Sequence, residues 1–350
     1  MSSYLDKLEI CTYSVIVPSS GSAHLPQSYY PTPSALQFPP AAKKMSGHYP
    51  ASLHPTRTRI GWIGIGVMGG AMASRLISAG YSLSIYARSP SKAASLLSLG
   101  ASLAASPADL AASSDVVFTM IGHPSDVQTL VLDTLLPSLD PGTVIVDHTS
   151  SHPALARRIY RSALERRCYS VDAPVSGGDV GARDGRLAIF AGGDSEVVQW
   201  LKPLFDILGK VNYMGGAGKG HSCKIANQIA VGGNLLGLSE GLVFAGKSGL
   251  DKEKYLEAVR GGAAGSMAME LFGKRMIGRD FRPGGFAEYM VKDLGMAADV
   301  AEEEGHTGTV VLPGAALVKQ LFSGMVANGD GKLGTQGLVT VVERINCLGG

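Results

Sequence analysis

The stretch Arg59-Ile60-Gly61-Trp62-Ile63-Gly64-Ile65-Gly66-Val67-Met68-Gly69 decides the fold of this chain. Its apolar start predicts a buried strand, and a helix is predicted directly after it, over Met68–Ala79. Gly64 permits a tight turn, Gly66 lets a pyrophosphate approach the backbone, and Gly69 lets the helix pack on the strand. The helix N-terminus offers amide donors to phosphates. We therefore predict a dinucleotide site that includes Gly64, Ile65, Gly66, Val67, Met68 and Gly69.

Strand and helix patterns alternate from residue 59 to residue 218, which predicts an α/β fold with a doubly wound parallel sheet of the Rossmann type. Strand patterns vanish after about Gly220, so we expect an all-helical substrate and dimerisation domain over 219–350. The predicted strands are Arg59–Gly64, Ser82–Ala87, Asp115–Ile121, Thr143–His148, Cys168–Asp172, Leu187–Ala191 and Lys210–Met214.

Residues 1–58 differ from the rest, because eight prolines stand among Ser, Tyr and Gly without a sustained apolar period. This composition predicts a disordered leader. Mitochondrial presequences are rich in arginine and poor in acids, whereas this segment carries Asp6 and Glu9 and has its first arginine at Arg57. We therefore favour a cytoplasmic location, with a mitochondrial one as the alternative.

Composition argues against several classes of protein. Lys and Arg number 31 against 29 Asp and Glu, so no basic footprint for nucleic acid is present. The four cysteines are far apart, which predicts neither a zinc site nor a disulfide framework. The sequence has no uninterrupted run of about 18 apolar residues, so we predict no membrane span. His148 and His152 are four apart, but Pro153 begins the next helix only after them, so we expect no metal site.

The partner of the cofactor ribose is expected about 20 residues after the glycine turn, where an acidic residue usually accepts from the 2′-hydroxyl. The sequence there reads Tyr86-Ala87-Arg88-Ser89-Pro90-Ser91-Lys92, without an acid. Arg88, Ser89 and Lys92 suit a 2′-phosphate, so we predict that NADP(H) is favoured over NAD(H). The alternative is an ordinary solvated basic loop.

A second loop follows the predicted strand 168–172 and reads Asp172-Ala173-Pro174-Val175-Ser176-Gly177-Gly178. Ligands of open α/β sheets bind beyond the carboxyl ends of strands. Ser176 and the amides of Gly177 and Gly178 suit a substrate carboxylate, because small residues leave the donors exposed. By composition, an ordinary turn is an equal alternative.

Two lysines complete the set of candidates. Lys224, Asn227 and Gln228 share one face of a long apolar helix, where polar groups are costly unless they have partners or a task. The alternative is a surface lysine. Lys292, followed by Asp293 in a later helix, could reach a cleft between the domains or could simply be exposed.

These motifs together resemble the β-hydroxyacid dehydrogenase family, and in particular its plant 3-hydroxyisobutyrate dehydrogenase-like members, from about residue 58 to the end. Residues 64–76 resemble the cofactor signature of that family, and Asp172–Gly178 resembles its substrate loop. The resemblance implies that Lys224 is the catalytic acid/base and that Asn227 binds substrate beside it. The further cofactor contacts that it implies are Met120, Ile121, Ser150 and Lys292.

The resemblance implies an oxidoreductase that transfers a hydride between NAD(P) and a short hydroxy acid or its semialdehyde, and a homo-oligomer. Two alternatives stay open: an NADPH-dependent glyoxylate or succinic semialdehyde reductase, and a non-catalytic nucleotide-binding module. Three positions depart from the family pattern. Arg75 replaces Asn, Ser or His, Thr149-Ser150 inverts Ser-Thr, and Ala87 replaces Asn or Asp.

Overall fold

The computed structural model describes residues 52–302 and 310–347, so most of the predicted leader lies outside the described residues. The strands are β1 (Ile60–Ile63), β2 (Leu83–Tyr86), β3 (Ser102–Leu103), β4 (Val116–Thr119), β5 (Val144–Asp147), β6 (Tyr169–Asp172), β7 (Val175–Ser176), β8 (Leu187–Gly192) and β9 (Gly209–Gly215). The helices up to the end of the sheet are α1 (Val67–Ser78), α2 (Ala94–Ser98), α3 (Pro107–Ala112), α4 (Pro124–Val127), α5 (Leu136–Ser138), α6 (Pro153–Glu165), α7 (Gly178–Asp184), α8 (Ser195–Trp200) and α9 (Lys202–Leu208). The later helices are α10 (Lys219–Lys247), α11 (Lys252–Val259), α12 (Met267–Ile277), α13 (Ala287–Glu302), α14 (Pro313–Ala327) and α15 (Leu338–Ile345). Three short helices of other types are η1 (Pro90–Ala93), η2 (Gln128–Leu135) and η3 (Thr335–Gly337).

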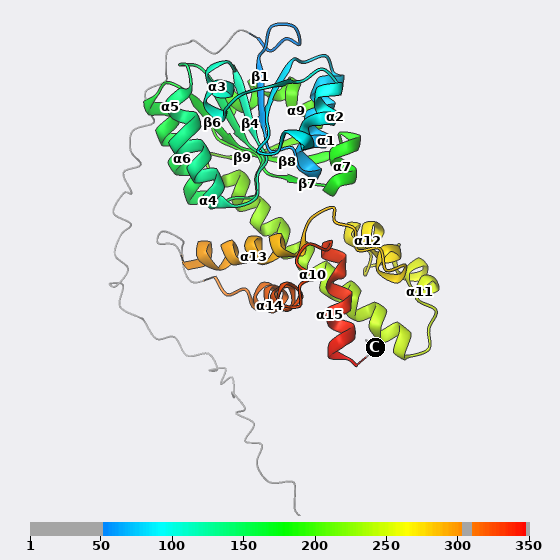
Figure 1. Ribbon diagram of the computed structural model, residues 1–350. Helices are drawn as coiled ribbons and strands as arrows, with labels where there is room; N and C mark the ends of the chain where they lie inside the picture. Colours follow the sequence, from blue (N-terminus) through cyan, green and yellow to red (C-terminus); the bar gives the residue numbers. More distant parts are fainter. Residues whose placement is uncertain (1–51, 303–309, 348–350) are drawn as a thin grey trace, which may run out of the picture. The chain divides into compact units, whose positions relative to one another are not determined.

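The seven predicted strands all form, and the sheet has the predicted winding (Figure 1). Its order is β3-β2-β1-β4-β5-β6-β8-β7, with β9 beside β8. The chain moves outward in one direction from β1 to β3 and in the other from β4 onward. A crevice therefore opens at the carboxyl ends of β1 and β4, where such sheets bind ligands. The sequence did not predict β3 and β7, because each is only two residues long.

Alternate residues of the central strands enter two different cores. Trp62 and Phe118 pack on the side that also includes Met72 of α1. Ile63 and Val117 pack on the opposite side, with the helices from α3 to α6. Side chains of a strand alternate between its faces, so a strand covered on both sides reads as one continuous apolar run.

The predicted parallel sheet is confirmed from β3 to β6, and the sheet becomes mixed at its far end. β8 pairs antiparallel with both β6 and β7, whereas the pairs from β3 to β6 are parallel. Only the segment 177–186 joins β7 to β8. A parallel crossover needs a dozen or more residues, so this connection returns the chain in the opposite direction.

The long helix α10 leaves the sheet and organises the helices that follow it. It contacts β6, β7 and β8 near its start and α12, α13, α14 and α15 along the rest. Leu235, Leu238 and Leu242 of α10 share a core with Met290 and Phe322. Among the described residues after α10, the only β pairing is the isolated bridge between Phe286 and Gly334.

By length and composition alone, α10 is apolar enough to cross a membrane. It is the one described helix that passes this test, and 39% of its most apolar window is buried inside the molecule. The sequence predicts a long apolar helix here but no membrane span, because Lys224 and polar side chains interrupt its apolar residues.

Candidate active site

The glycine turn between β1 and α1 has the form that the sequence predicts. Gly64 has φ +98°, and a Cβ there would lie 2.1 Å from the carbonyl oxygen of Met120. A Cβ on Gly69 would lie 1.9 Å from the carbonyl oxygen of Gly64. A Cβ on Gly66 would meet nothing within 4 Å, so the space in front of this residue is open. Gly66 and Val67 are exposed, and Ile65 and Met68 are half-buried.

This open backbone at the N-terminus of a 12-residue helix fits the pyrophosphate of a dinucleotide. Two of the three glycines are required by packing, whereas Gly66 leaves room that no described side chain fills. The residues present therefore fit the cofactor that the sequence predicts.

Arg88, Ser89 and Lys92 follow β2, which is the parallel neighbour of β1, so they lie at the same edge of the sheet as the glycine turn. All three are exposed. Ser89 stands at the N-cap of η1 without a side-chain bond to it. Arg88 has no hydrogen bond or ion pair with any described residue, so its guanidinium is available to a ligand.

The segments that follow β4 and β5 lie beside each other and are joined to α13. The amide of Ile121 donates to Thr149 Oγ1 at 3.0 Å. Lys292 Nζ donates to the carbonyl oxygens of Gly122 at 3.1 Å and Ser150 at 2.6 Å. The structure therefore brings together the residues Met120, Ile121, Ser150 and Lys292, and Lys292 is largely buried instead of exposed.

The loop after β6 turns sharply because Gly177 has φ +135° and Gly178 has φ +63°. Ser176, Gly177 and Gly178 are all half-buried, and a Cβ on Gly178 would meet nothing within 4 Å. Asp172, the first residue of the same motif, points elsewhere. Its carboxylate accepts from the amides of Gly218 at 2.8 Å and His221 at 2.9 Å, so it caps the start of α10.

Lys224 lies one turn into α10 and is half-buried. Burial lowers the pKa of its ammonium group to about 8, and Lys292 lowers it further, while Asp293 and Cys223 oppose the shift. Asp293 is 3% exposed and accepts from Gln228 Nε2 at 2.8 Å. Lys224 therefore loses its proton at a lower pH than an exposed lysine does, and the buried carboxylate of Asp293 acts on it.

Asn227 and Gln228 are joined by a 3.0 Å bond from Asn227 Nδ2 to Gln228 Oε1. Gln228 continues to Asp293 on α13. The polar face that the sequence predicts on α10 thus has partners on the neighbouring helix. The side-chain oxygen of Asn227 remains able to accept from another donor, because the bond to Gln228 uses only the nitrogen.

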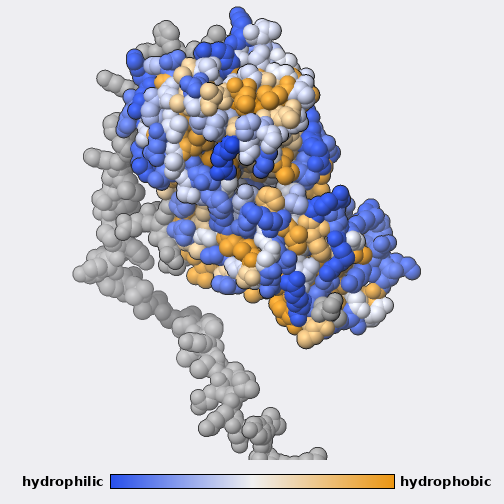
Figure 2. Space-filling model, in the orientation of Figure 1, coloured by the Kyte–Doolittle hydropathy of each residue, from blue (hydrophilic) through white to orange (hydrophobic). Residues whose placement is uncertain are grey.

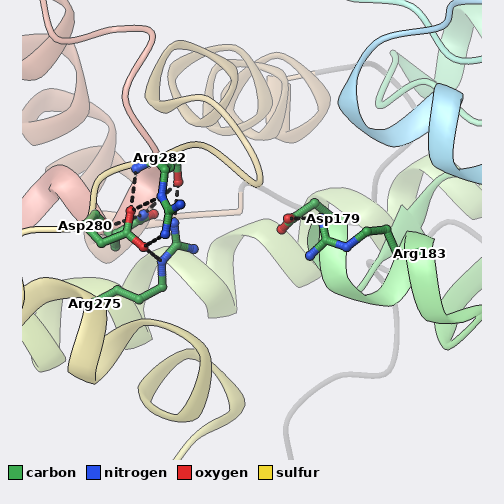
Figure 3. A network of polar contacts seen from close by, with 6 residues as sticks. Asp179, Arg183, Arg275, Asp280 and Arg282 are labelled. Atoms are coloured by element: carbon green, nitrogen blue, oxygen red, sulfur yellow. Dashed lines mark hydrogen bonds and ion pairs between the residues drawn. The ribbon is translucent and has the colours of Figure 1, made fainter. Parts of the chain in front are cut away.

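Two groups of charged side chains, one around Asp280 and one around Asp179, lie on segments near the loop after β6. Figure 3 shows Asp280 receiving bonds from Arg275 and Arg282, while Asp179 pairs with Arg183 at 2.7 Å. Arg282 and Arg275 hold the pKa of Asp280 well below its ordinary value. A Cβ on Gly284 would lie 2.4 Å from Asp179 Oδ1. The segment between α12 and α13 therefore lies against the start of α7, beside Ser176–Gly178.

Sequence reasoning missed several polar residues behind this site. The sequence predicts Asp293 only as part of a motif with Lys292, and it indicates no role for Asp147 or His221. Asp147 and His221 are buried, with His221 Nε2 3.7 Å from Asp147 Oδ2. Burial alone would raise the pKa of Asp147, but His221, Thr149 and Thr119 outweigh it and lower the pKa. An apolar strand that ends in an acid was the one available signal.

His148 faces aromatic rings and a backbone carbonyl group. It is buried between Phe118 and Phe205, and burial lowers its pKa to about 4. Its ring nitrogen Nδ1 lies 2.5 Å from the carbonyl oxygen of Ala173. Within the described ranges, no group of three potential metal-binding side chains is found.

Comparison with known proteins supports a dinucleotide site built from these residues. Residues 59–216 match the NAD-binding domain of 6-phosphogluconate dehydrogenase, and residues 218–342 match the NAD-binding domain of NADP-dependent 3-hydroxyisobutyrate dehydrogenase. A probable mitochondrial 3-hydroxyisobutyrate dehydrogenase-like protein of Arabidopsis thaliana is 58% identical over 87% of this chain and 93% of its own length. The 2-hydroxy-3-oxopropionate reductase of Escherichia coli is 38% identical over 81% of this chain and 97% of its own.

A solved structure of 3-hydroxyisobutyrate dehydrogenase from Mycobacterium tuberculosis, with L-serine, superposes with a TM-score of 0.73 at 26% identity. It covers 81% of this chain and 99% of that one. Fold and site thus define a dinucleotide-dependent oxidoreductase. The chain belongs to the 3-hydroxyisobutyrate dehydrogenase family, whose members transfer a hydride between NAD(P) and a short hydroxy acid or its semialdehyde.

Proposed function

We propose that this protein is an NADP(H)-preferring enzyme in which Lys224 is the general acid and base for a short hydroxy acid or its semialdehyde. The observation that carries the proposal is that α10 brings Lys224 to the part of α13 where Lys292 bonds the cofactor segments and Asp293 is buried against Gln228 of α10. Burial there lowers the pKa of Lys224 to about 8. A general acid or base works best when its pKa is near the working pH. The alternative of a non-catalytic nucleotide-binding module leaves this arrangement without a purpose.

The cofactor would be held by the glycine turn, by the segments around Met120–Ile121 and Ser150, and by Lys292. Bound NAD(P)(H) supplies or accepts the hydride at the carbon that bears the substrate oxygen. In reduction, the Lys224 ammonium gives a proton to that oxygen. In oxidation, the neutral Lys224 amine removes the hydroxyl proton.

The preference for NADP(H) is supported by charge. No acidic residue lies between Gly64 and Lys92, so this stretch offers no carboxylate to repel a 2′-phosphate. Arg88 is exposed at the same edge and can present its planar fork to the phosphate. Ser89 and Lys92 are exposed beside it.

On the substrate side, we assign the carboxylate to Ser176 and the amides of Gly177 and Gly178. Positive φ angles expose these amides, and the space over Gly178 is open. The free side-chain oxygen or the amide of Asn227 would orient the substrate oxygen beside Lys224. Residues 59–218 thus serve as the dinucleotide domain and residues 219–350 as the substrate and dimerisation domain.

A homo-oligomer is supported by one face of α10. Residues at spacings of three and four along it are exposed: Ala226, Ala230, Gly233, Gly237, Glu240 and Phe244. Phe244 is 71% exposed, at the opposite end of the stripe from the small Ala226. If two copies of α10 paired antiparallel through this face, the bulky Phe244 of one copy would lie opposite the small Ala226 of the other. Figure 2 also shows orange patches among the blue over the helices after α10.

Light scattering at several protein concentrations measures the mass of the particle in solution. A mass that stays monomeric at high concentration would reject the homo-oligomer.

A mitochondrial location is supported by the name of one relative. The Arabidopsis relative carries the word mitochondrial in its name, which supports the mitochondrial alternative, while nothing in the comparisons supports a cytoplasmic one. A fluorescent protein fused after residues 1–58 should enter mitochondria. Diffuse fluorescence throughout the cytoplasm would favour the other location.

One assay tests the function directly. The enzyme is given 3-hydroxyisobutyrate, glyoxylate, succinic semialdehyde or 2-hydroxy-3-oxopropionate, each with both cofactors. The last compound is included because of the relative from Escherichia coli, which makes a semialdehyde reductase the second candidate. We expect kcat/KM to be highest for one of these acids with NADP(H). Absence of turnover with all four would contradict the proposal.

A further inference from the structure

Three polar side chains are buried where α10 starts against the ends of β5 and β6. Asp147 is 6% exposed, Asp172 is 4% exposed and His221 is 1% exposed. Carboxylates and imidazoles are costly to bury unless they are paired. Asp172 is satisfied by the two amides of the first turn of α10. The other two residues need a different explanation.

Asp147 and His221 join α10 to the loops that follow β4 and β5. His221 Nε2 lies 3.7 Å from Asp147 Oδ2. The other oxygen, Oδ1, accepts from Thr119 Oγ1 at 2.8 Å and from the amide of Thr149 at 3.0 Å. Thr149 in turn accepts from the amide of Ile121. One chain of contacts therefore runs from the first turn of α10 to the segments assigned to the cofactor.

No hydrogen bond to Asp147 Oδ2 or to His221 Nδ1 is present within the described part of the chain. The contact with His221 Nε2 is thus the one polar contact that Asp147 Oδ2 has there. Loss of His221 would leave a buried carboxylate oxygen unpaired, which is among the more costly defects in a core.

His221 also has a fixed relation to Lys224. The two residues are three apart on α10, so they lie on neighbouring turns of the same helical face. The groups that face Lys224 are Asp293 and Lys292 from α13 and Cys223 from α10 itself. Any rotation or shift of the first turn of α10 therefore moves the Lys224 ammonium relative to these groups and to the cofactor segments.

We propose that His221 and Asp147 are positioning residues, which seat the first turn of α10 on the cofactor segments and so set the place of Lys224. The proposal rests on the proposed role of Lys224 in turnover, but the contacts that define it are independent of that role. Misplacement of a reacting group by about 1 Å can cost about 100-fold in rate.

The test compares His221→Leu, which keeps an apolar side chain without a donor, with His221→Gln, which keeps an amide donor within reach of Asp147. We expect kcat of His221→Leu to fall by about 10- to 100-fold, with the KM for the cofactor changed much less, and His221→Gln to recover most of the loss. Equal kcat for His221→Leu and the wild type would overturn the proposal. So would equal losses in both variants.

A second readout needs no substrate. An amine-reactive reagent labels Lys224 at a series of pH values, and peptide mass spectrometry gives the midpoint. We expect a midpoint near 8 for the wild type and His221→Gln, and a higher one for His221→Leu, whose Lys224 is less desolvated. The exposed Lys247 on the same helix is the internal reference. An unchanged Lys224 midpoint in a folded His221→Leu protein would also overturn the proposal, whatever the role of Lys224 in turnover. If His221→Leu does not fold, Asp147→Asn provides the same comparison. This substitution removes the carboxylate charge of Asp147 and keeps a side-chain oxygen that accepts from Thr119 and Thr149.

Discussion

Lys224 is held where water solvates its ammonium poorly and where two charges from α13 act on it in opposite directions. Lys292 lowers the pKa of Lys224 and Asp293 raises it. Burial has the largest effect, and the net pKa of about 8 lies well below the 10.5 of an exposed lysine. At neutral pH most of the molecules carry the ammonium form, and the amine becomes the major form above about 8.

The pH profile follows from these charges. Reduction uses the ammonium, so its kcat should fall above pH 8, whereas oxidation uses the amine, so its kcat should rise toward pH 8 and then level off. Asp293→Asn removes the group that raises the pKa of Lys224, so both profiles should move to lower pH. Asp299→Asn changes an exposed acid of the same helix and should leave them in place. Steady-state rates from pH 6 to 10 measure both. Profiles that Asp293→Asn leaves unmoved would show that another group titrates.

Arg88 provides the prediction about cofactor choice. The wild-type enzyme should prefer NADPH by at least about tenfold, because a charge-assisted contact is worth about 1.5 to 3 kcal/mol. Arg88→Ala should raise KM for NADPH far more than KM for NADH. Arg166→Ala is the control, since Arg166 precedes β6 and is exposed at the opposite edge of the sheet. A wild-type preference for NADH, or a preference unchanged in Arg88→Ala, would defeat the assignment.

At the scale of elements, the start of α10 depends on close packing against the sheet. A Cβ on Gly220 would lie 2.3 Å from the carbonyl oxygen of Phe190 and 2.4 Å from that of Asp172. Both neighbours belong to strand backbones that cannot move freely. The helix that carries Lys224 therefore approaches β6 and β8 as closely as it does only because this residue is glycine.

Gly220→Ala should destabilise the protein by about 1 to 3 kcal/mol, the usual cost of overpacking, and should lower kcat because Lys224 shifts with its helix. Gly324→Ala is the matched control in α14, where a Cβ would meet nothing within 4 Å. That change should be neutral or stabilising by up to about 1 kcal/mol. Urea unfolding measures both. Equal stability of the two variants would show that the start of α10 has room to adjust.

The sequence predicted the elements that repeat a strong pattern. Trp62 and Phe118 lie in continuous apolar runs, and such runs mark strands covered on both faces. It did not predict β3 or β7, because two-residue strands carry no pattern, and it did not predict the antiparallel direction of β8, which depends on a short connection.

For the site, the sequence predicted residues whose type and spacing alone indicate a chemical role, such as the glycines of the first turn and Lys224. It did not predict that Asp172 caps α10 or that His221 faces Asp147. Those pairs join residues 46 and 74 positions apart, which only the fold brings together. The motif Asp172–Gly178 could not show that Asp172 caps the start of α10 while Gly177 and Gly178 form the turn after β7.

At the scale of the whole molecule, residues 1–44 should be dispensable for catalysis, because their sequence has no periodic apolar face to bury. Deletion of 1–44 should leave the melting temperature and kcat within experimental error of the full chain. Deletion of 1–63 is the contrast, since it removes β1, which pairs with both β2 and β4, and should abolish folding. Insolubility or loss of most activity in the shorter deletion would show that the leader packs on the enzyme.

The central claim is that Lys224 supplies and removes the proton, and one measurement tests it most directly. Lys224→Ala is compared with the wild type for turnover and, by fluorescence titration, for NADPH binding, with Lys247→Ala as the control on the exposed end of the same helix. Loss of a positioned acid should lower kcat by about 10² to 10⁴, or roughly 3 to 5 kcal/mol of barrier, while the Kd for NADPH changes little. A Lys224→Ala enzyme that keeps more than about a tenth of the wild-type kcat would contradict the claim.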